Sequence, residues 1–187
     1  GYRSGFVGIV GPTNAGKSTL VNALMGRKVS IVSARAQTTY HGVRAVLNDE
    51  RAQLVLTDTP GFQRHNEPVA RLLNRVADKH AKECDSLAWV FDASNPRALK
   101  QIEKLQPKIS TFKPMERSIC VLNKIDDVSK PTLLPLMLAI SEMKLFRDVV
   151  PVSAKKGDGI ERLANVLRSL LPEGQPMYPA DTLTDRP

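Results

Sequence analysis

Residues 6–25 read FVGIVGPTNAGKSTLVNALM, and the two halves of this stretch have different patterns. Phe6 to Val10 is a short apolar run, typical of a buried strand. Lys17 to Met25 spaces its apolar residues three or four apart, as an amphipathic helix does. The segment that joins them, Gly11 to Ser18, fits the pattern G-x-x-x-x-G-K-[ST]. A strand, a glycine-rich loop and a helix in this order predict a phosphate-binding loop.

The residue types of this loop suit a polyphosphate. Gly11 and Gly16 let the backbone curl, so that successive N–H groups point into one concavity beside the positive end of the helix. We expect Lys17 to neutralise the β- and γ-phosphates and the Ser18 hydroxyl to bind Mg²⁺. The residues expected to contact the nucleotide here are Gly11, Pro12, Thr13, Asn14, Ala15, Gly16, Lys17, Ser18 and Thr19.

Apolar runs and amphipathic stretches alternate along most of the chain. This alternation predicts an α/β fold of three layers, the P-loop NTPase or Ras-like type, with helices on both faces of a six-stranded, mostly parallel sheet. Only residues 48–52 separate the second and third strands, so these two should form a hairpin with one antiparallel edge strand. The predicted strands are Phe6 to Val10, Val43 to Leu47, Gln53 to Thr57, Leu87 to Phe91, Ser118 to Leu122 and Val149 to Val152. The predicted helices are Lys17 to Met25, Glu67 to Lys82, Pro96 to Lys108, Pro131 to Met143 and Ile160 to Leu170.

Composition sets limits on the class of protein. With 187 residues and 42% hydrophobic content, the chain suits one globular domain, and it has no apolar stretch long enough to cross a membrane. Cys84 and Cys120 lack metal-ligand spacing, so we expect two reduced core thiols in a cytoplasmic protein. The net charge of +8 is spread evenly along the chain. It favours contact with polyanions without identifying one.

A second acidic element, Asp58-Thr59-Pro60-Gly61, follows an apolar strand. We expect Asp58 to hold Mg²⁺ through water opposite Ser18, and the Gly61 N–H to face the γ-phosphate. Asp92 also ends an apolar strand, but no glycine follows it. We therefore assign Asp92 to a turn or a helix cap.

The segment Asn123-Lys124-Ile125-Asp126 follows another strand and selects the base. A carboxylate at Asp126 accepts two parallel hydrogen bonds from guanine, whereas adenine offers no such pair. Lys124 can lay its methylene stem along the purine, and Asn123 can tie this loop to the phosphate loop. Ser153-Ala154-Lys155, after the last strand, supplies a backbone N–H for guanine O6. The sequence thus predicts GTP rather than ATP.

In this order the motifs resemble a translation-factor-class GTPase domain, and three features narrow the resemblance to the Era-type GTPases of the TrmE-Era-EngA-like superfamily. These features are residues 14–22, residues 28–33 leading to Gln37-Thr38-Thr39, and the closing segment, residues 171–187. The resemblance implies a GTPase domain over residues 1–171. It also implies that residues 172–187, a linker or a surface arm, lead toward a KH domain that is absent from these 187 residues.

The resemblance also assigns roles in the switch loops, expected around residues 28–42 and 59–68. Thr39 would close on Mg²⁺ and the γ-phosphate only in the GTP state, with Thr38 as the alternative ligand. Phe62, next to Gly61, stands where Ras-like enzymes keep a glutamine that orients water, and Gln63 should point elsewhere.

Several relatives with such a hydrophobic substitution use K⁺. We hypothesise that K⁺ held by Asn14 stabilises transition-state charge here, and the alternative that Asn14 only supports the loop turn stays open. The catalytic residues are then Lys17, Thr39, Gly61 and Asn14.

The function implied by the resemblance is slow hydrolysis of GTP to GDP and phosphate in small ribosomal subunit assembly and 16S-type rRNA maturation. The implied partners are GTP, GDP, Mg²⁺ and the subunit with its rRNA, the last mainly through the KH domain. We expect a monomer, and peripheral membrane contact and an organellar relative stay open. Two alternatives also stay open: a nucleotide-gated docking module for RNA or the ribosome, with hydrolysis only as a timer, and the GTPase domain of a tRNA-modifying or double-domain relative.

Overall fold

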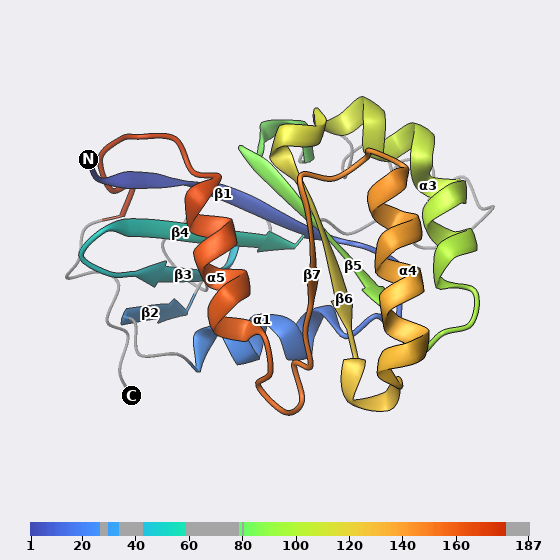
Figure 1. The fold of residues 1–187 in the computed structure, drawn as a ribbon. Helices are drawn as coiled ribbons and strands as arrows, with labels where there is room; N and C mark the ends of the chain where they lie inside the picture. Colours follow the sequence, from blue (N-terminus) through green and yellow to red (C-terminus); the bar gives the residue numbers. More distant parts are fainter. Residues whose placement is uncertain (27–29, 34–42, 59–78, 80, 179–187) are drawn as a thin grey trace, which may run out of the picture.

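A seven-stranded sheet forms the middle layer of the molecule (Figure 1). The computed structural model describes residues 1–26, 30–33, 43–58, 79 and 81–178. The strands follow the order β2-β3-β4-β1-β5-β6-β7 across the sheet. Their bounds are β1 Arg3–Val10, β2 Ser30–Ser33, β3 Val43–Asn48, β4 Ala52–Asp58, β5 Ser86–Asp92, β6 Ser118–Asn123 and β7 Asp148–Pro151. The α-helices are α1 Lys17–Met25, α3 Ala98–Phe112, α4 Lys130–Glu142 and α5 Ile160–Ser169, and 3₁₀ turns span Met115–Arg117 and Ile125–Asp127.

The predicted α/β fold with a mostly parallel sheet and one antiparallel strand is confirmed. Strands β4, β1, β5, β6 and β7 are parallel, and β3 runs antiparallel to β4. The structure adds one short strand to the six predicted, because β2 pairs with β3 in the register Ser30↔Asn48 to Ser33↔Ala45. The antiparallel strand is therefore next to the edge rather than at it. Four residues inside an expected switch loop gave no sequence signal strong enough to predict β2.

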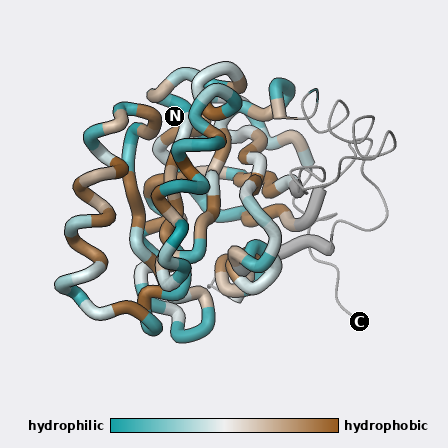
Figure 2. The backbone as a smooth tube through the Cα atoms, turned by 90° about the vertical axis from the view of Figure 1, so that its right-hand side faces the viewer, coloured by the Kyte–Doolittle hydropathy of each residue, from teal (hydrophilic) through white to brown (hydrophobic). Residues whose placement is uncertain are grey.

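Two hydrophobic layers hold the helices against the sheet. Helices α1 and α5 cover one face, and their buried residues pack with those of β1, β3 and β4. Helices α3 and α4 cover the other face, where Trp89 and Phe91 of β5 are fully buried. In Figure 2 the hydrophobic residues gather on the strands and on the helix turns that face them. The central parallel strands are buried on both faces, which explains their uninterrupted apolar sequences.

Helix α3 is longer than predicted. It continues through Pro107 to Phe112, because Ile109 and Phe112 are buried in the core and the Phe112 ring stacks on Trp89 at a centroid distance of 6.2 Å. Of the helix predicted over residues 67–82, only residues 79, 81 and 82 are described, and these are helical. No helix among the described residues is long and apolar enough to cross a membrane. Both cysteines are buried thiols that form no disulfide among the described residues, as predicted.

The residues after α5 lie along the sheet. Gly174 N donates to Tyr2 O and the Ser4 hydroxyl donates to Gln175 O, which holds the segment to β1. The fully buried side chain of Gln53 on β4 accepts from the N–H groups of Met177 and Tyr178 and donates to Tyr178 O. Residues 172–178 therefore form a surface arm, one of the two forms expected for this segment. The remainder of the predicted linker lies outside the described residues.

Candidate nucleotide-binding site

The phosphate loop joins the end of β1 to the start of α1, as predicted. Gly11 has φ +146°, and a Cβ there would lie 2.2 Å from the carbonyl oxygen of Val90 in β5. Gly16, the N-cap of α1, has φ +90°. Asn14 also adopts a positive φ of 68°, which is uncommon for a residue with a side chain. The loop therefore depends on two glycines and one strained residue to turn tightly over β5.

Two side chains at the start of α1 face the place expected for phosphates. Lys17 Nζ donates to Gly11 O over 3.1 Å, so the lysine folds back across the loop. Ser18 is exposed, and within the described part of the chain its hydroxyl makes no hydrogen bond. Backbone amides, a helix N-terminus, a lysine and a hydroxyl at one point form a donor set that suits a phosphate chain with a divalent cation.

One buried asparagine connects three loops. Asn123, at the end of β6, donates from Nδ2 to Ala15 O of the phosphate loop over 3.0 Å. Its Oδ1 accepts from Ala154 N of the loop after β7, also over 3.0 Å. The predicted tie between the base loop and the phosphate loop is thus present, and the same side chain adds a third loop.

The base loops enclose a cavity of about 300 Å³, which Gly16, Thr19, Asn123, Lys124, Asp126, Asp127, Ala154 and Lys155 line. Asp126 Oδ1 accepts from the Ser153 hydroxyl over 2.8 Å, so the carboxylate is held in place before any base arrives. Ala154 N already donates to Asn123. Lys156 N and Gly157 N donate to Ser153. In this loop Lys155 therefore offers the backbone N–H that makes no hydrogen bond with another described residue, and it is our candidate donor to guanine O6.

Lys124 lies between the phosphate loop and Asp92. Its Nζ donates to Asn14 O over 2.8 Å and approaches Asp92 Oδ2 at 3.3 Å. Burial opposes ionisation of Asp92, but hydrogen bonds from Ser94 and the charge of Lys124 outweigh it and lower the pKa of Asp92. The predicted turn role of Asp92 is present, since Ser94 N donates to Asp92 Oδ1 over 2.8 Å. The contact of Asp92 with Lys124 was not predicted from the sequence. The contact results from the pairing of β5 with β6, which sets Asp92 opposite Asn123, the residue before Lys124.

We expect Asp92→Asn to weaken GDP binding two- to threefold, because a partly exposed ion pair contributes about 0.5 kcal/mol to the position of the lysine. Titration of the chain with N-methylanthraniloyl-GDP would measure the change. Since the pKa of Asp92 is lowered, its contribution should be full above the ordinary aspartate range and lost as the pH falls through the lowered value. An unchanged dissociation constant at pH 7 would contradict this role.

Several predicted residues lie outside the described part of the chain. They are Thr38, Thr39, Thr59, Pro60, Gly61, Phe62 and Gln63. Of Asp58 the structure gives only the backbone, as the last residue of β4. The register Ile9↔Asp58 nevertheless places this residue beside the end of β1, where the phosphate loop begins. Of the residues expected to hold Mg²⁺, Ser18 has a side chain that the structure describes, and its exposed hydroxyl suits the ion.

Comparisons with known proteins agree with this geometry. Residues 6–124 match the family model described as 50S ribosome-binding GTPase. Over its full length the chain is 43% identical to GTPase Era of Bordetella pertussis and 40% identical to GTPase Era of Geotalea daltonii. It spans 62% of the length of each of these curated relatives. The predicted resemblance to Era-type GTPases is therefore confirmed.

Two solved structures are similar over nearly the whole chain. A variant of Era from Aquifex aeolicus bound to GDP·AlF4⁻ has a TM-score of 0.78 and 34% identity, and the match covers 99% of this chain and 62% of that one. Era in complex with MgGDPNP and nucleotides 1506–1542 of 16S ribosomal RNA has a TM-score of 0.76 and 34% identity, with 100% of this chain and 63% of that one covered. By the family model and these agreements, the chain belongs to the 50S ribosome-binding GTPase family.

Proposed function

We propose that the chain binds GTP with Mg²⁺ and hydrolyses it to GDP and phosphate. The observation that carries this proposal is the carboxylate of Asp126, fixed by Ser153 in a cavity that Lys124 and Gly16 also line. A fixed carboxylate acceptor beside a free backbone N–H matches the Watson–Crick edge of guanine. The same arrangement would leave the carboxylate without its two donors opposite adenine.

Positioning of the reactants and electrostatic stabilisation would accelerate the hydrolysis of GTP. The loop amides and Lys17 line the expected position of the β- and γ-phosphates. They can therefore stabilise the negative charge that develops as the γ-phosphoryl group is transferred to water. When bound, Mg²⁺ supplies further neutralisation of the phosphate oxygens. Ser18, Asp58 and Thr39 are the residues that would hold the ion, and the Gly61 N–H would face the γ-phosphate.

Asp126→Asn tests the base assignment. We expect the dissociation constant for GTP to rise roughly 30-fold, because a charge-assisted pair of hydrogen bonds is replaced by an amide that repels the guanine donors. Affinity for xanthosine triphosphate should rise instead. Competition of each triphosphate against labelled GDP measures both changes, and unchanged selectivity would overturn the guanine site. Glu116→Gln, at an exposed acid just before β6 and so at the opposite end of that strand from Asp126, is the matched control.

We propose further that Asn14 holds K⁺ beside the phosphates. Asn14 is exposed on the loop with a strained backbone, and its carbonyl already accepts from Lys124. Its side chain is thus at the phosphate loop, where a second cation could take the place of an arginine finger.

Hydrolysis should then be about tenfold faster in K⁺ than in Na⁺ buffers, since one added positive group at the transition state is worth at least this much. Asn14→Ala should remove the difference. Release of phosphate in matched KCl and NaCl series measures the effect. Equal rates in the two salts would show that Asn14 only supports the turn.

For the biological role we propose a cytoplasmic GTP switch in small ribosomal subunit assembly and rRNA maturation. The support is the similarity to Era, one of whose structures holds a segment of 16S ribosomal RNA. Measuring the GTPase rate with and without small subunits separates an enzyme stimulated by the ribosome from a docking module that hydrolyses GTP only as a timer. Stimulation of turnover supports the first, and nucleotide-dependent docking without stimulation supports the second.

A further inference from the structure

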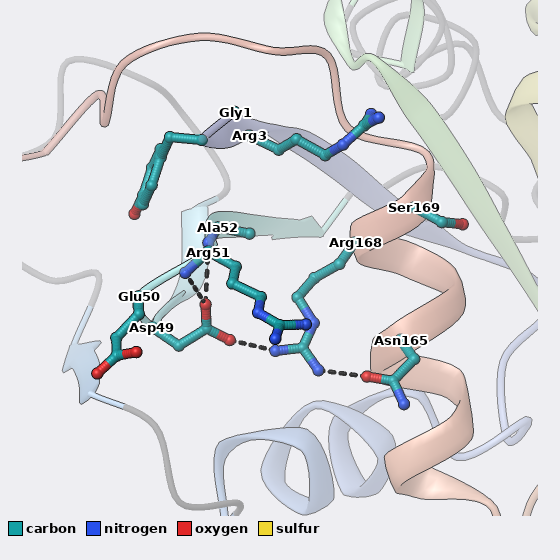
Figure 3. Close-up of a pocket in the computed structure, with 10 residues that line it drawn as sticks. Gly1, Arg3, Asp49, Glu50, Arg51, Ala52, Asn165, Arg168 and Ser169 are labelled. Carbon is teal, nitrogen blue, oxygen red and sulfur yellow. Dashed lines mark hydrogen bonds and ion pairs between the residues drawn. The ribbon is translucent and has the colours of Figure 1, made fainter.

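A second cavity, of about 860 Å³, lies at the opposite end of the sheet from the nucleotide site (Figure 3). Three segments line it: the start of β1, the turn between β3 and β4, and the last turns of α5. Strands β1 and β4 begin at this cavity. Their other ends lie at the nucleotide site, where Gly11 follows β1 and Asp58 is the last residue of β4. A ligand in this cavity would therefore leave the GTP site open.

Asp49, an acid that lines this cavity, is already committed. Asp49 Oδ1 accepts from the backbone N–H groups of Arg51 and Ala52 over 2.7 and 2.9 Å. Its Oδ2 is paired with the guanidinium of Arg168. Burial opposes ionisation of Asp49. The two backbone hydrogen bonds and the charge of Arg168 outweigh this effect and lower the pKa of Asp49. In Figure 3 the side chain of Glu50 points away from the arginines.

Donors, by contrast, remain available. Arg51 is exposed, and its guanidinium makes no hydrogen bond or ion pair with the described residues. Arg3 uses one N–H, from Nη1 to Leu171 O over 2.5 Å. Asn165 Oδ1 accepts from Arg168, which leaves the Asn165 amide N–H groups as donors. The cavity thus offers guanidinium and amide donors while the carboxylate of Asp49 is occupied, which suits an anion with several oxygens.

An aromatic ring narrows the class of anion. Tyr2 also lines the cavity, half-buried, and its hydroxyl donates to Asn48 Oδ1 over 2.9 Å, which fixes the ring. Guanidinium groups beside a fixed aromatic ring are the combination that binds single-stranded nucleic acid, where the cations take phosphates and the ring stacks a base. A simple inorganic anion or a lipid headgroup has no base that could stack on the ring.

We infer that this cavity binds single-stranded RNA, with Arg51 on a backbone phosphate and Tyr2 stacked against the adjoining base. In Figure 3 the guanidinium of Arg3 points away from that of Arg51, so Arg3 would take a separate phosphate. The choice of RNA over DNA rests on the proposed function. The site belongs to these 187 residues, in addition to any RNA contact made by a KH domain. The even spread of the +8 charge supplies attraction at long range, and the cavity supplies the place of contact.

Fluorescence anisotropy with a fluorescein-labelled uridine decamer tests the inference. The chain is kept in excess GDP so that the nucleotide site is filled, and the titration is repeated at several KCl concentrations. We expect Arg51→Ala to weaken binding about fivefold and to lower the slope of log Kd against log salt by about 0.7, the value for one lost phosphate contact on a single strand. Lys104→Ala, which removes one exposed charge from α3, is the matched control and should change Kd less than twofold.

Tyr2 variants separate stacking from charge. Tyr2→Leu should weaken binding about tenfold with an unchanged salt slope, since stacking on one aromatic ring contributes roughly 1–3 kcal/mol per base. Tyr2→Phe, which keeps the ring and loses the bond to Asn48, should bind within about threefold of the original chain. Thermal melting of each variant checks that it is folded.

Three results would overturn the inference: no binding of the decamer, equal losses for Arg51→Ala and Lys104→Ala, or an unchanged Kd for Tyr2→Leu. Binding of phosphatidylglycerol vesicles without binding of the decamer would also overturn it and would assign the cavity to a membrane. Binding of labelled GTP, measured in parallel, keeps the two proposals apart. If GTP binds and the decamer does not, only the RNA site fails. If GTP does not bind, the proposed GTPase function fails whatever the decamer does.

Discussion

Replacing Gly11 by alanine is expected to lower the free energy of unfolding by about 4 kcal/mol and the melting temperature by roughly 10 °C. The added methyl group would lie 2.2 Å from the carbonyl oxygen of Val90, which belongs to a fully buried central strand and cannot move aside. The backbone at φ +146° is also poorly suited to alanine. Thermal unfolding followed by circular dichroism measures the loss, and labelled GDP should no longer bind.

Gly157 provides a matched control for this change. It too has a positive φ, of 87°, but a Cβ there meets no atom within 4 Å. Gly157→Ala should therefore lower the free energy of unfolding only by the backbone strain, about 1 kcal/mol. The difference between the two variants isolates the collision with Val90. Equal losses of stability would show that φ alone, and not the close approach to β5, requires Gly11.

The second large effect is expected for Asn123→Ala. Asn123 is 3% exposed, and its removal leaves Ala15 O and Ala154 N buried without their partner. Each unpaired buried group costs about 1–3 kcal/mol, so the free energy of unfolding should fall by about 3 kcal/mol. The three loops around the nucleotide would lose their common support, and the dissociation constant for GDP should rise on the order of a hundredfold.

Chemical denaturation and titration with labelled GDP measure these two quantities. Asn95→Ala serves as the control, because Asn95 accepts a backbone hydrogen bond from Arg97 at an exposed turn, where water can replace it. Asn123→Ala with normal GDP affinity would contradict the view that this side chain organises the site.

The sequence predicted the parts of this protein that depend on local pattern. The phosphate loop, six of the seven strands and the position of Asn123 between two loops all follow from residue type, period and spacing. The carboxyl ends of parallel strands meet at one sheet edge, so motifs far apart in sequence could be placed together without coordinates.

The rest depends on contacts between segments that no local pattern reveals. The predicted helix ends at Lys108, one residue after Pro107, yet burial of Ile109 and Phe112 carries α3 to Phe112. The pairing of Lys124 with Asp92 follows from strand register, not from either motif. The arginines of the second cavity lie at positions 3, 51 and 168, and only the folded chain brings them together.

The arm after α5 changes where this domain ends as a folding unit. Nucleotide motifs are complete by Lys155, and the last helix ends at Ser169, so a boundary near Leu171 looks natural from the sequence. A chain cut there would remove the arm that packs on the amide of Gln53, together with the three hydrogen bonds between that amide and residues 177 and 178. This amide binds the arm much as a neighbouring strand would. We therefore expect a chain that extends through Tyr178 to be more stable than one cut at Leu171, so that the unit that folds is longer than the unit that binds the nucleotide.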